Sequence, residues 1–185
     1  MTPPTSFDPG RDLPAPDQAY QQLLAQCRDW LAQRAGQAVH VTGVWAGGVW
    51  LAARLHADLG LAGEPGCISS TLHRDDFAQR GLSASTDATR LPFEVDGAHI
   101  LLVDDVLQTG RTVRAVMNEL HDFGRPASIA LAVLLDRSNG RELPIAATCA
   151  GQRLAVPTDC RLSLEPLGER RAAPQDYRWE LVRSA

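Results

Sequence analysis

The sequence predicts an α/β fold in which helices flank a parallel sheet, with a mobile flap and a small region of strands near the C-terminus. Two observations support this fold class. Short apolar runs alternate with segments whose apolar residues recur at helical spacing, and turn residues separate the two kinds of segment. Such alternation favours parallel strands, because each helix returns the chain to the same end of the sheet. At 185 residues the chain can bury a substantial core.

The N-terminal residues 1–16 are rich in proline and show no hydrophobic period. We therefore predict a disordered or loosely packed arm over 1–16 and one folded domain over 17–185. The domain begins with apolar residues at helical spacing, which predict a helix that Asp17 can cap and Gly36 can close.

The other elements follow from the same patterns. Strands are predicted over 39–44, 67–72, 100–103, 128–135, 146–149, 161–167 and 177–182. Helices are predicted over 49–59 and from 113 to the Gly-Arg-Pro stop at 124–126. The polar segment 73–96 lacks helical spacing, and its length predicts a flap with functional mobility.

The most informative stretch of the sequence joins a strand to a helix. After the apolar run 100–103 come two carboxylates, Asp104 and Asp105, and then a loop of small residues, 109–112, that opens a helix. Ligands of open α/β sheets bind beyond the carboxyl ends of the strands, and backbone N–H groups at a helix N-terminus attract phosphate. Adjacent carboxylates suit two neighbouring hydroxyls or a hard cation such as Mg²⁺. The stretch predicts a site for a phosphorylated sugar with a vicinal diol.

This stretch resembles the 5-phosphoribosyl-1-pyrophosphate (PRPP) motif of type I phosphoribosyltransferases. In that family the acid pair holds the ribose hydroxyls, and the Thr-Gly-x-Thr loop holds the 5-phosphate. The resemblance implies the type I phosphoribosyltransferase fold, with Asp104 and Asp105 as catalytic residues. The PRPP-binding residues that it implies are Ala46, Gly47, Asp104, Asp105, Val106, Leu107, Gln108, Thr109, Gly110, Arg111 and Thr112.

Four further stretches, 48–52, 71–76, 103–107 and 141–145, resemble the pyrimidine operon regulator / uracil phosphoribosyltransferase (PyrR) family. The Thr-Leu-x-Arg-Asp-Asp and Arg-Glu-Leu-Pro segments among them are the most diagnostic. The resemblance implies an enzyme of pyrimidine salvage that converts uracil and PRPP to UMP and pyrophosphate, with Mg²⁺ bound mainly through PRPP and no dedicated metal site. It also implies a homodimer or homotetramer, and some relatives bind a pyrimidine-operon mRNA leader when UMP is present.

Three further positions are assigned to the base, and one to pyrophosphate. The resemblance and the position at a strand end assign uracil and nucleotide binding to Asp136, Arg137 and Arg141. Arg137 has an alternative role in a salt bridge to Asp136 or to a neighbouring subunit. Arg74, in the flap, is the candidate catalytic cation over pyrophosphate, and its alternative is a surface ion pair with Asp75 or Asp76. Gln108 stands where hypoxanthine-type relatives carry a carboxylate, which favours a pyrimidine.

The sequence departs from the family in the loop 43–48, where Trp45 and Ala46 replace polar residues that contact pyrophosphate. Backbone N–H groups of such a loop can still bind the anion. His73 replaces an aromatic residue before the flap's Arg-Asp-Asp. The loop before Arg141 is one residue longer than usual, which affects the proposed uracil contacts.

Composition excludes several other classes. All 18 basic residues are arginine, so a Walker A phosphate loop and Schiff-base chemistry, which both need lysine, are excluded. The net charge of −4 does not favour a general nucleic-acid binder. No apolar run is long enough to span a membrane, and the four cysteines lack metal-binding spacing, so we expect a cytoplasmic protein with reduced thiols.

Two alternative functions stay open from the sequence. The altered Trp45-Ala46 loop motivates a UMP-sensing, RNA-binding regulator with weak or no catalysis. The second alternative is a phosphoribosyltransferase for another base, such as hypoxanthine or guanine.

Overall fold

A computed structural model describes residues 7–69, 88–167 and 177–183 of the chain. The elements are α1 (Pro9–Asp12), α2 (Pro16–Ala32), β1 (Val39–Val44), α3 (Gly47–Asp58), β2 (Gly66–Ile68), β3 (His99–Leu107), α4 (Arg111–Phe123), β4 (Ser128–Arg137), β5 (Cys149–Leu154), β6 (Cys160–Pro166) and β7 (Tyr177–Arg183). No helix among these residues is long and apolar enough to cross a membrane.

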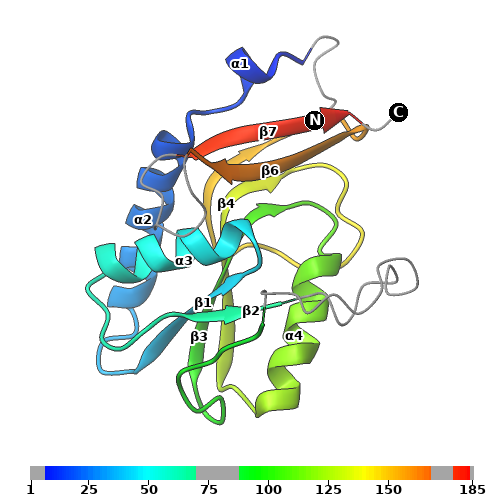
Figure 1. Cartoon of the computed structure of the whole chain (residues 1–185). Coiled ribbons are helices and arrows are strands. Elements are labelled where there is room, and N and C mark those ends of the chain that lie inside the picture. Colours follow the sequence, from blue (N-terminus) through cyan, green and yellow to red (C-terminus); the bar gives the residue numbers. More distant parts are fainter. Residues whose placement is uncertain (1–6, 70–87, 168–176, 184–185) are drawn as a thin grey trace.

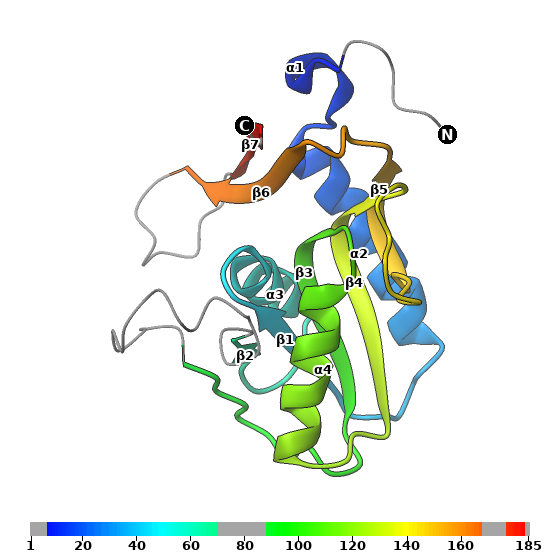
Figure 2. The same ribbon diagram turned by 90° about the vertical axis from the view of Figure 1, so that its right-hand side faces the viewer.

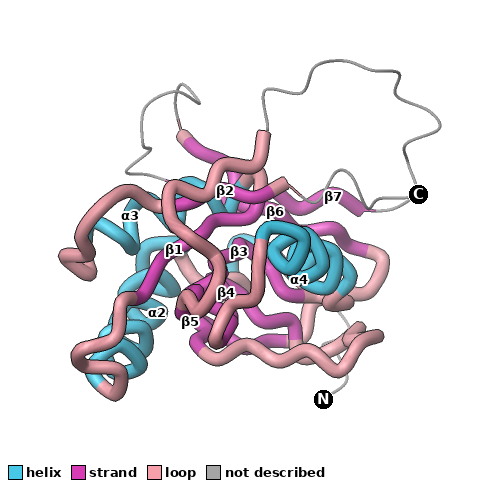
Figure 3. The backbone as a smooth tube through the Cα atoms, turned by 90° about the horizontal axis from the view of Figure 1, so that it is seen from below, coloured by secondary structure: helices cyan, strands magenta, loops and turns pink. Residues whose placement is uncertain are grey.

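Five strands form one parallel sheet in the order β2-β1-β3-β4-β5, which confirms the predicted fold class. Helices α2 and α3 cover one face of the sheet and α4 covers the other (Figures 1 and 3). The strands β1, β3 and β4 end at the same edge, where their carboxyl ends meet. The fold therefore creates the kind of edge at which α/β proteins bind ligands.

Alternation within β3 explains why its apolar run is continuous. Leu101 and Val103 pack in the cluster beneath α2 and α3, whereas Ile100 and Leu102 pack against α4. Successive side chains of a strand point to opposite faces, so a strand covered on both faces needs apolar residues at every position. This burial anchors β3 immediately before the acid pair.

The outer edge of β5 is closed by helix α2. The Gln26 side-chain amide donates to the carbonyl of Ala150 (2.7 Å) and accepts from its N–H (3.1 Å), as a neighbouring strand would. A Cβ atom at Gly151 would lie 2.3 Å from the carbonyl oxygen of Ala19, so the helix and strand backbones are in direct contact. Helix α2 thus satisfies the polar groups of an edge strand and fixes β5 against the sheet.

Strands β6 and β7 form a separate antiparallel hairpin that lies above the carboxyl ends of the parallel strands (Figure 2). The hairpin packs through Cys160 and Leu162 on Phe7, Leu13 and Leu135 in a third apolar cluster. The N-terminal segment therefore supports the hairpin.

The prediction of a disordered or loosely packed arm over 1–16 was wrong for its described part. Residues 9–12 form α1, and the side chains of Phe7 and Leu13 are buried. The indole N–H of Trp179 donates to the carbonyl of Pro14 at 2.7 Å. Proline-rich composition hid this packing, because the apolar partners of the segment come from the other end of the chain.

Several predicted boundaries also differ from the structure. Strand β3 continues through the acid pair to Leu107, because it stays paired with β4 as far as Asp136. Helix α2 begins at Pro16, and Asp17 forms an ion pair with Arg54 (2.8 Å) instead of capping the helix. The strand expected over 146–149 begins at Cys149. Most of the predicted flap lies outside the described residues.

We predict that Gly151→Ala destabilises the fold by about 2 kcal/mol, because the new methyl group would overlap the backbone of α2. The matched control is Gly10→Ala, whose Cβ would meet Asp8 at an ordinary 3.5 Å and should change stability by less than about 0.5 kcal/mol. Urea denaturation measures both. Equal stabilities of the two variants would contradict close contact between α2 and β5.

We predict that Tyr177→Phe reduces the loss of stability at alkaline pH. Burial raises the pKa of Tyr177 to about 12, and its hydroxyl has no hydrogen-bond partner within the described part of the chain. The unfolded state, with a pKa near 10, therefore loses its proton first, and stability falls as the pH rises between 10 and 12. The variant should match the wild type at pH 7 and retain about 1 kcal/mol more at pH 11 in urea denaturation. If Tyr177→Phe lost as much stability between pH 7 and pH 11 as the wild type, the raised pKa of Tyr177 would be contradicted.

Candidate active site

A cavity of about 680 Å³ lies between the carboxyl ends of the parallel strands and the β6–β7 hairpin. Its lining comes from four places: the β1–α3 loop, the end of β3 with the start of α4, Ser69 after β2, and the hairpin. The lining residues are Trp45, Ala46, Gly47, Ser69, Asp104, Asp105, Val106, Leu107, Gln108, Thr109, Gly110, Thr112, Val113, Arg161, Leu162, Ser163, Leu164, Glu165, Glu180 and Val182. The cavity thus includes most positions of the predicted PRPP site.

The acid pair lies inside β3 and not after it. The Asp104 carboxylate accepts the N–H of Asp105 (3.0 Å) and is largely buried. The Asp105 carboxylate accepts two backbone N–H groups, from Val106 through Oδ1 (2.9 Å) and from Leu164 of β6 through Oδ2 (2.9 Å). Asp105 therefore joins the parallel sheet to the hairpin, and backbone donors orient both of its oxygens.

The β1–α3 loop lies directly against this acid pair. A Cβ atom at Gly47 would lie 2.7 Å from Asp105 Oδ2, and one at Gly48 would lie 2.3 Å from the carbonyl oxygen of Val103. Only glycine permits this approach. The Trp45–Ala46 peptide bond is cis. The structure thus brings Ala46 and Gly47, which the resemblance assigns to PRPP, beside the motif strand.

The predicted phosphate loop follows β3 and opens α4. Gly110 adopts a positive φ of 89° at the start of the helix, and the Arg111 N–H bonds to the Thr109 hydroxyl (3.2 Å). The first turn of a helix presents N–H groups without intrahelical partners, and Thr112 and Val113 of this turn line the cavity. The arrangement suits an anion. Arg111 alone among the predicted PRPP residues does not line the cavity, because its side chain points outward to Glu142 (2.6 Å).

The three side chains assigned to the base do not line the cavity. Arg137 is fully buried and donates to the carbonyls of Cys160 (2.9 Å), Val156 (3.1 Å) and Pro157 (2.9 Å). Burial among neutral acceptors lowers the pKa of its guanidinium. The prediction that Arg137 contacts the base is therefore wrong: its side chain anchors the segment that leads into β6. The alternative ion pair with Asp136 does not form either, because the Asp136 carboxylate pairs with Arg141 and Arg153.

Asp136 and Arg141 form an ion pair with each other, and neither residue lines the cavity. The Asp136 carboxylate bonds to Arg141 and to Arg153 (3.3 Å), and it is largely buried. Arg141 also donates to the carbonyl of Gln108, one residue before the phosphate loop. Both residues thus lie behind the loop and not on its ligand side. Arg74 and His73 lie outside the described residues.

The hairpin supplies cavity residues that sequence reasoning missed. Along β6 the side chains of Cys160, Leu162 and Leu164 are buried, and the cavity lining includes residues 161–165. The polar lining residues of the hairpin are Arg161, Ser163, Glu165 and Glu180. The alternation Arg-x-Ser-x-Glu in the sequence was the available signal, but it does not say which layer the polar face meets.

Comparison with known proteins decides the family. A family model described as a phosphoribosyl transferase domain matches residues 17–154. A protein of Ralstonia nicotianae named bifunctional protein PyrR is 52% identical over 150 residues, which cover 81% of this chain and 85% of that protein. The chain belongs to the PyrR family of phosphoribosyltransferases. A PyrR protein of Pseudomonas aeruginosa is 43% identical over 152 residues, covering 82% and 89% of the two chains.

Solved structures support the same fold for this PyrR-family chain. A hypoxanthine-guanine phosphoribosyltransferase of Bacillus anthracis has a TM-score of 0.63 at 17% identity and covers 81% of this chain and 85% of its own. The enzyme of Leishmania tarentolae in complex with GMP has a TM-score of 0.58 at 20% identity, covering 83% and 84%. At these sequence identities the similarity shows a shared fold and nothing about activity.

Metal binding by protein side chains alone is not indicated in the described ranges. No three side chains of His, Cys, Asp or Glu come together there as a metal-binding group. Each oxygen of Asp105 already accepts a backbone N–H, so a cation at this carboxylate would need most of its oxygen ligands from elsewhere.

We predict that Asp105→Asn loosens the hairpin while Asp104→Asn does not. An amide at position 105 has one acceptor, so its NH₂ group would face either Val106 N–H or Leu164 N–H. An amide at 104 keeps the acceptor that the Asp105 N–H uses. Hydrogen exchange should be at least tenfold faster in Asp105→Asn alone, at whichever of Leu164 and Val106 loses its acceptor. Equal exchange in both variants would contradict the link between β3 and β6.

Proposed function

We propose that the protein is a uracil phosphoribosyltransferase that converts uracil and PRPP to UMP and pyrophosphate. The observation that supports it most is the placement of an acid pair and an anion-binding loop on one cavity beneath the hairpin. The names of the PyrR relatives support the regulator/transferase class.

In the proposed reaction the cavity holds PRPP between three elements. Asp104 and Asp105 accept hydrogen bonds from the ribose 2- and 3-hydroxyls, and the loop 109–112 binds the 5-phosphate through N–H and hydroxyl groups. The bond from C1 of the ribose to pyrophosphate breaks, a bond from C1 to N1 of uracil forms, and the N1 proton passes to the departing pyrophosphate or to solvent. The carboxylates below the ring stabilise the positive charge that develops on the sugar.

Pyrophosphate occupies the side of the cavity next to the β1–α3 loop in this proposal. The backbone of Ala46 and Gly47 contacts pyrophosphate, and Arg74 of the flap adds a positive charge. Mg²⁺, held mainly by PRPP oxygens, would supply positive charge to the leaving group. The Ser163 hydroxyl, which can donate or accept, and the Glu165 carboxylate, which accepts, face the ring edge of uracil in this proposal.

The direct test is UMP formation from uracil, PRPP and Mg²⁺, with hypoxanthine, guanine and orotate as competing bases. We expect turnover with uracil and at least a hundredfold less with the others. Replacing both acids, Asp104→Asn with Asp105→Asn, should lower kcat/KM by at least a hundredfold and leave the circular dichroism spectrum unchanged. Preferred turnover of a purine would contradict the uracil assignment, and unchanged kinetics of the double variant would contradict the role of the acid pair.

A second candidate function is a regulator that senses UMP and binds a pyrimidine-operon mRNA leader as a homodimer or homotetramer. Trp45 and Ala46 in the cavity favour it, since this loop lacks the polar side chains of the family pattern. Retention of leader RNA at several salt concentrations, with and without UMP, tests it. Binding that needs UMP would support the regulator, and no binding at low salt would exclude it.

A further inference from the structure

The Arg-Glu-Leu-Pro segment after β4 packs against the back of the phosphate loop. The N–H groups of Glu142 and Leu143 both donate to the carbonyl of Thr109 (3.1 Å each). A Cβ atom at Gly110 would lie 3.4 Å from Leu143 and 3.3 Å from Ile145. The loop that would hold phosphate on one side is therefore held by 142–145 on the other.

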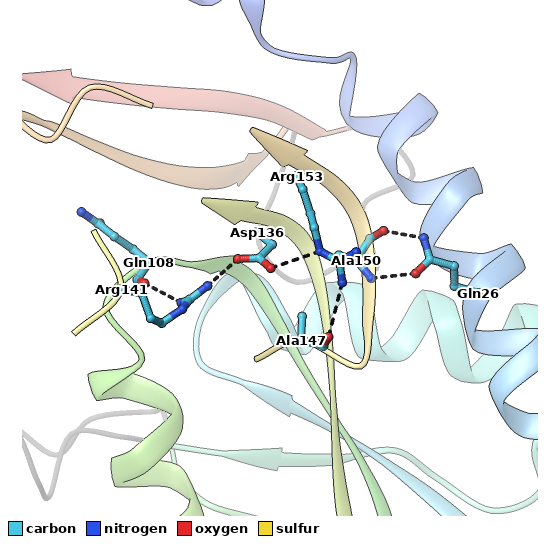
Figure 4. A network of polar contacts seen from close by, with 7 residues as sticks. All are labelled: Gln26, Gln108, Asp136, Arg141, Ala147, Ala150 and Arg153. Atoms are coloured by element: carbon cyan, nitrogen blue, oxygen red, sulfur yellow. Dashed lines mark hydrogen bonds and ion pairs between the residues drawn. The ribbon is translucent and has the colours of Figure 1, made fainter. Parts of the chain in front are cut away.

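Arg141 extends this support to the residue before the loop. Its guanidinium donates to the carbonyl of Gln108 and, through a second nitrogen, to the Asp136 carboxylate (Figure 4). Arginine makes this double contact because its planar group presents several donors in fixed directions. The Gln108 carbonyl is thus fixed by a side chain that starts 33 residues further along the sequence.

Asp136 is held in turn from the opposite side. Its second oxygen accepts from Arg153 of β5 (3.3 Å), and Arg153 also donates to the carbonyl of Ala147 (3.4 Å; Figure 4). Strand β5 is clamped to α2 by the two bonds between Gln26 and Ala150. The chain of contacts therefore runs from a rigid edge of the sheet, through one carboxylate, to the start of the phosphate loop.

The position of Asp136 argues against direct contact with a ligand. The residue is 9% exposed, its two carboxylate oxygens each accept from a different arginine, and it does not line the cavity. A carboxylate between two guanidinium groups, largely out of water, has stronger charge-assisted bonds than an exposed ion pair. Such a group can act by fixing its neighbour.

We propose that Asp136 is a positioning residue for phosphate binding: through Arg141 it fixes the Gln108 carbonyl and with it the geometry of the loop 109–112. The inference rests on the proposed function only in assigning the 5-phosphate to this loop. It gives the Arg-Glu-Leu-Pro segment a role in binding the phosphate of PRPP and UMP and not in recognising the base.

The experiment compares ligands with and without a phosphate. Dissociation constants for UMP and uridine are measured by calorimetry, and KM for PRPP and uracil is measured where turnover occurs. Asp136→Asn and Arg141→Gln should each weaken UMP binding and raise KM for PRPP about tenfold, with uridine binding and kcat changed less than about threefold. The double variant should bind UMP about as weakly as either single variant, because both substitutions break the same connection between Asp136 and Arg141.

Two further variants serve as controls. Arg153→Gln removes the more exposed partner of Asp136 but leaves the contacts from Asp136 through Arg141 to the Gln108 carbonyl, so it should weaken UMP binding several-fold less than Arg141→Gln does. Arg141→Lys keeps the charge but cannot span Asp136 and the Gln108 carbonyl, so it should behave as Arg141→Gln does. Thermal unfolding without ligand tests whether each variant is folded. If Asp136→Asn or Arg141→Gln does not fold, Arg141→Lys takes its place in the comparison.

The outcomes separate this inference from the proposed function. Weaker binding of uridine or a higher KM for uracil alone would mean that Asp136 contacts the base, and would overturn the inference. Equal effects of Arg153→Gln and Arg141→Gln, or unchanged UMP binding in every variant, would also overturn it. A wild type that binds UMP but makes none, with UMP binding weakened in Asp136→Asn, would support the inference while refuting the proposed transferase.

Discussion

The site depends on one carboxylate, that of Asp105. One of its oxygens accepts the N–H of Leu164 in the hairpin, and the same oxygen faces Gly47 closely enough that only glycine fits there. Motif strand, β1–α3 loop and hairpin therefore meet at a single side chain. Because the carboxylate is already oriented by backbone donors, a sugar that hydrogen-bonds to it meets a fixed group and little reorganisation is needed.

The phosphate loop has a comparable arrangement on its outer side. Its ligand face is formed by the first turn of α4, but its shape is set from behind by the segment 141–145 and by the contacts of Asp136. The Arg-Glu-Leu-Pro segment can thus be understood as support for this loop. A side chain need not reach the ligand to control how well the ligand is held.

The hairpin explains why some expectations failed. Arg137 ends β4 and was predicted to contact the base, yet it is buried, and its two terminal nitrogens donate to three carbonyls of the segment 156–160. Polar residues of β6, Arg161, Ser163 and Glu165, line the cavity instead. The N-terminal segment, read as an arm from its prolines, packs on this hairpin through Phe7 and Leu13. These contacts join the two ends of the chain.

The sequence by itself determined the parallel sheet, the acid pair and the anion loop, because each depends on local order: an apolar run, then Asp104 and Asp105, then a glycine turn that opens a helix. It also determined the family, through short segments in a fixed order. Only the tertiary structure decided which polar groups face the cavity. Asp136, Arg137 and Arg141 lie at or just after the end of β4, where functional residues are often found. The directions of their side chains depend on β5 and the hairpin, which contact them only after the chain has folded. The hydrophobic period of a sequence predicts whether a side chain is buried, but it does not predict which partner buries it.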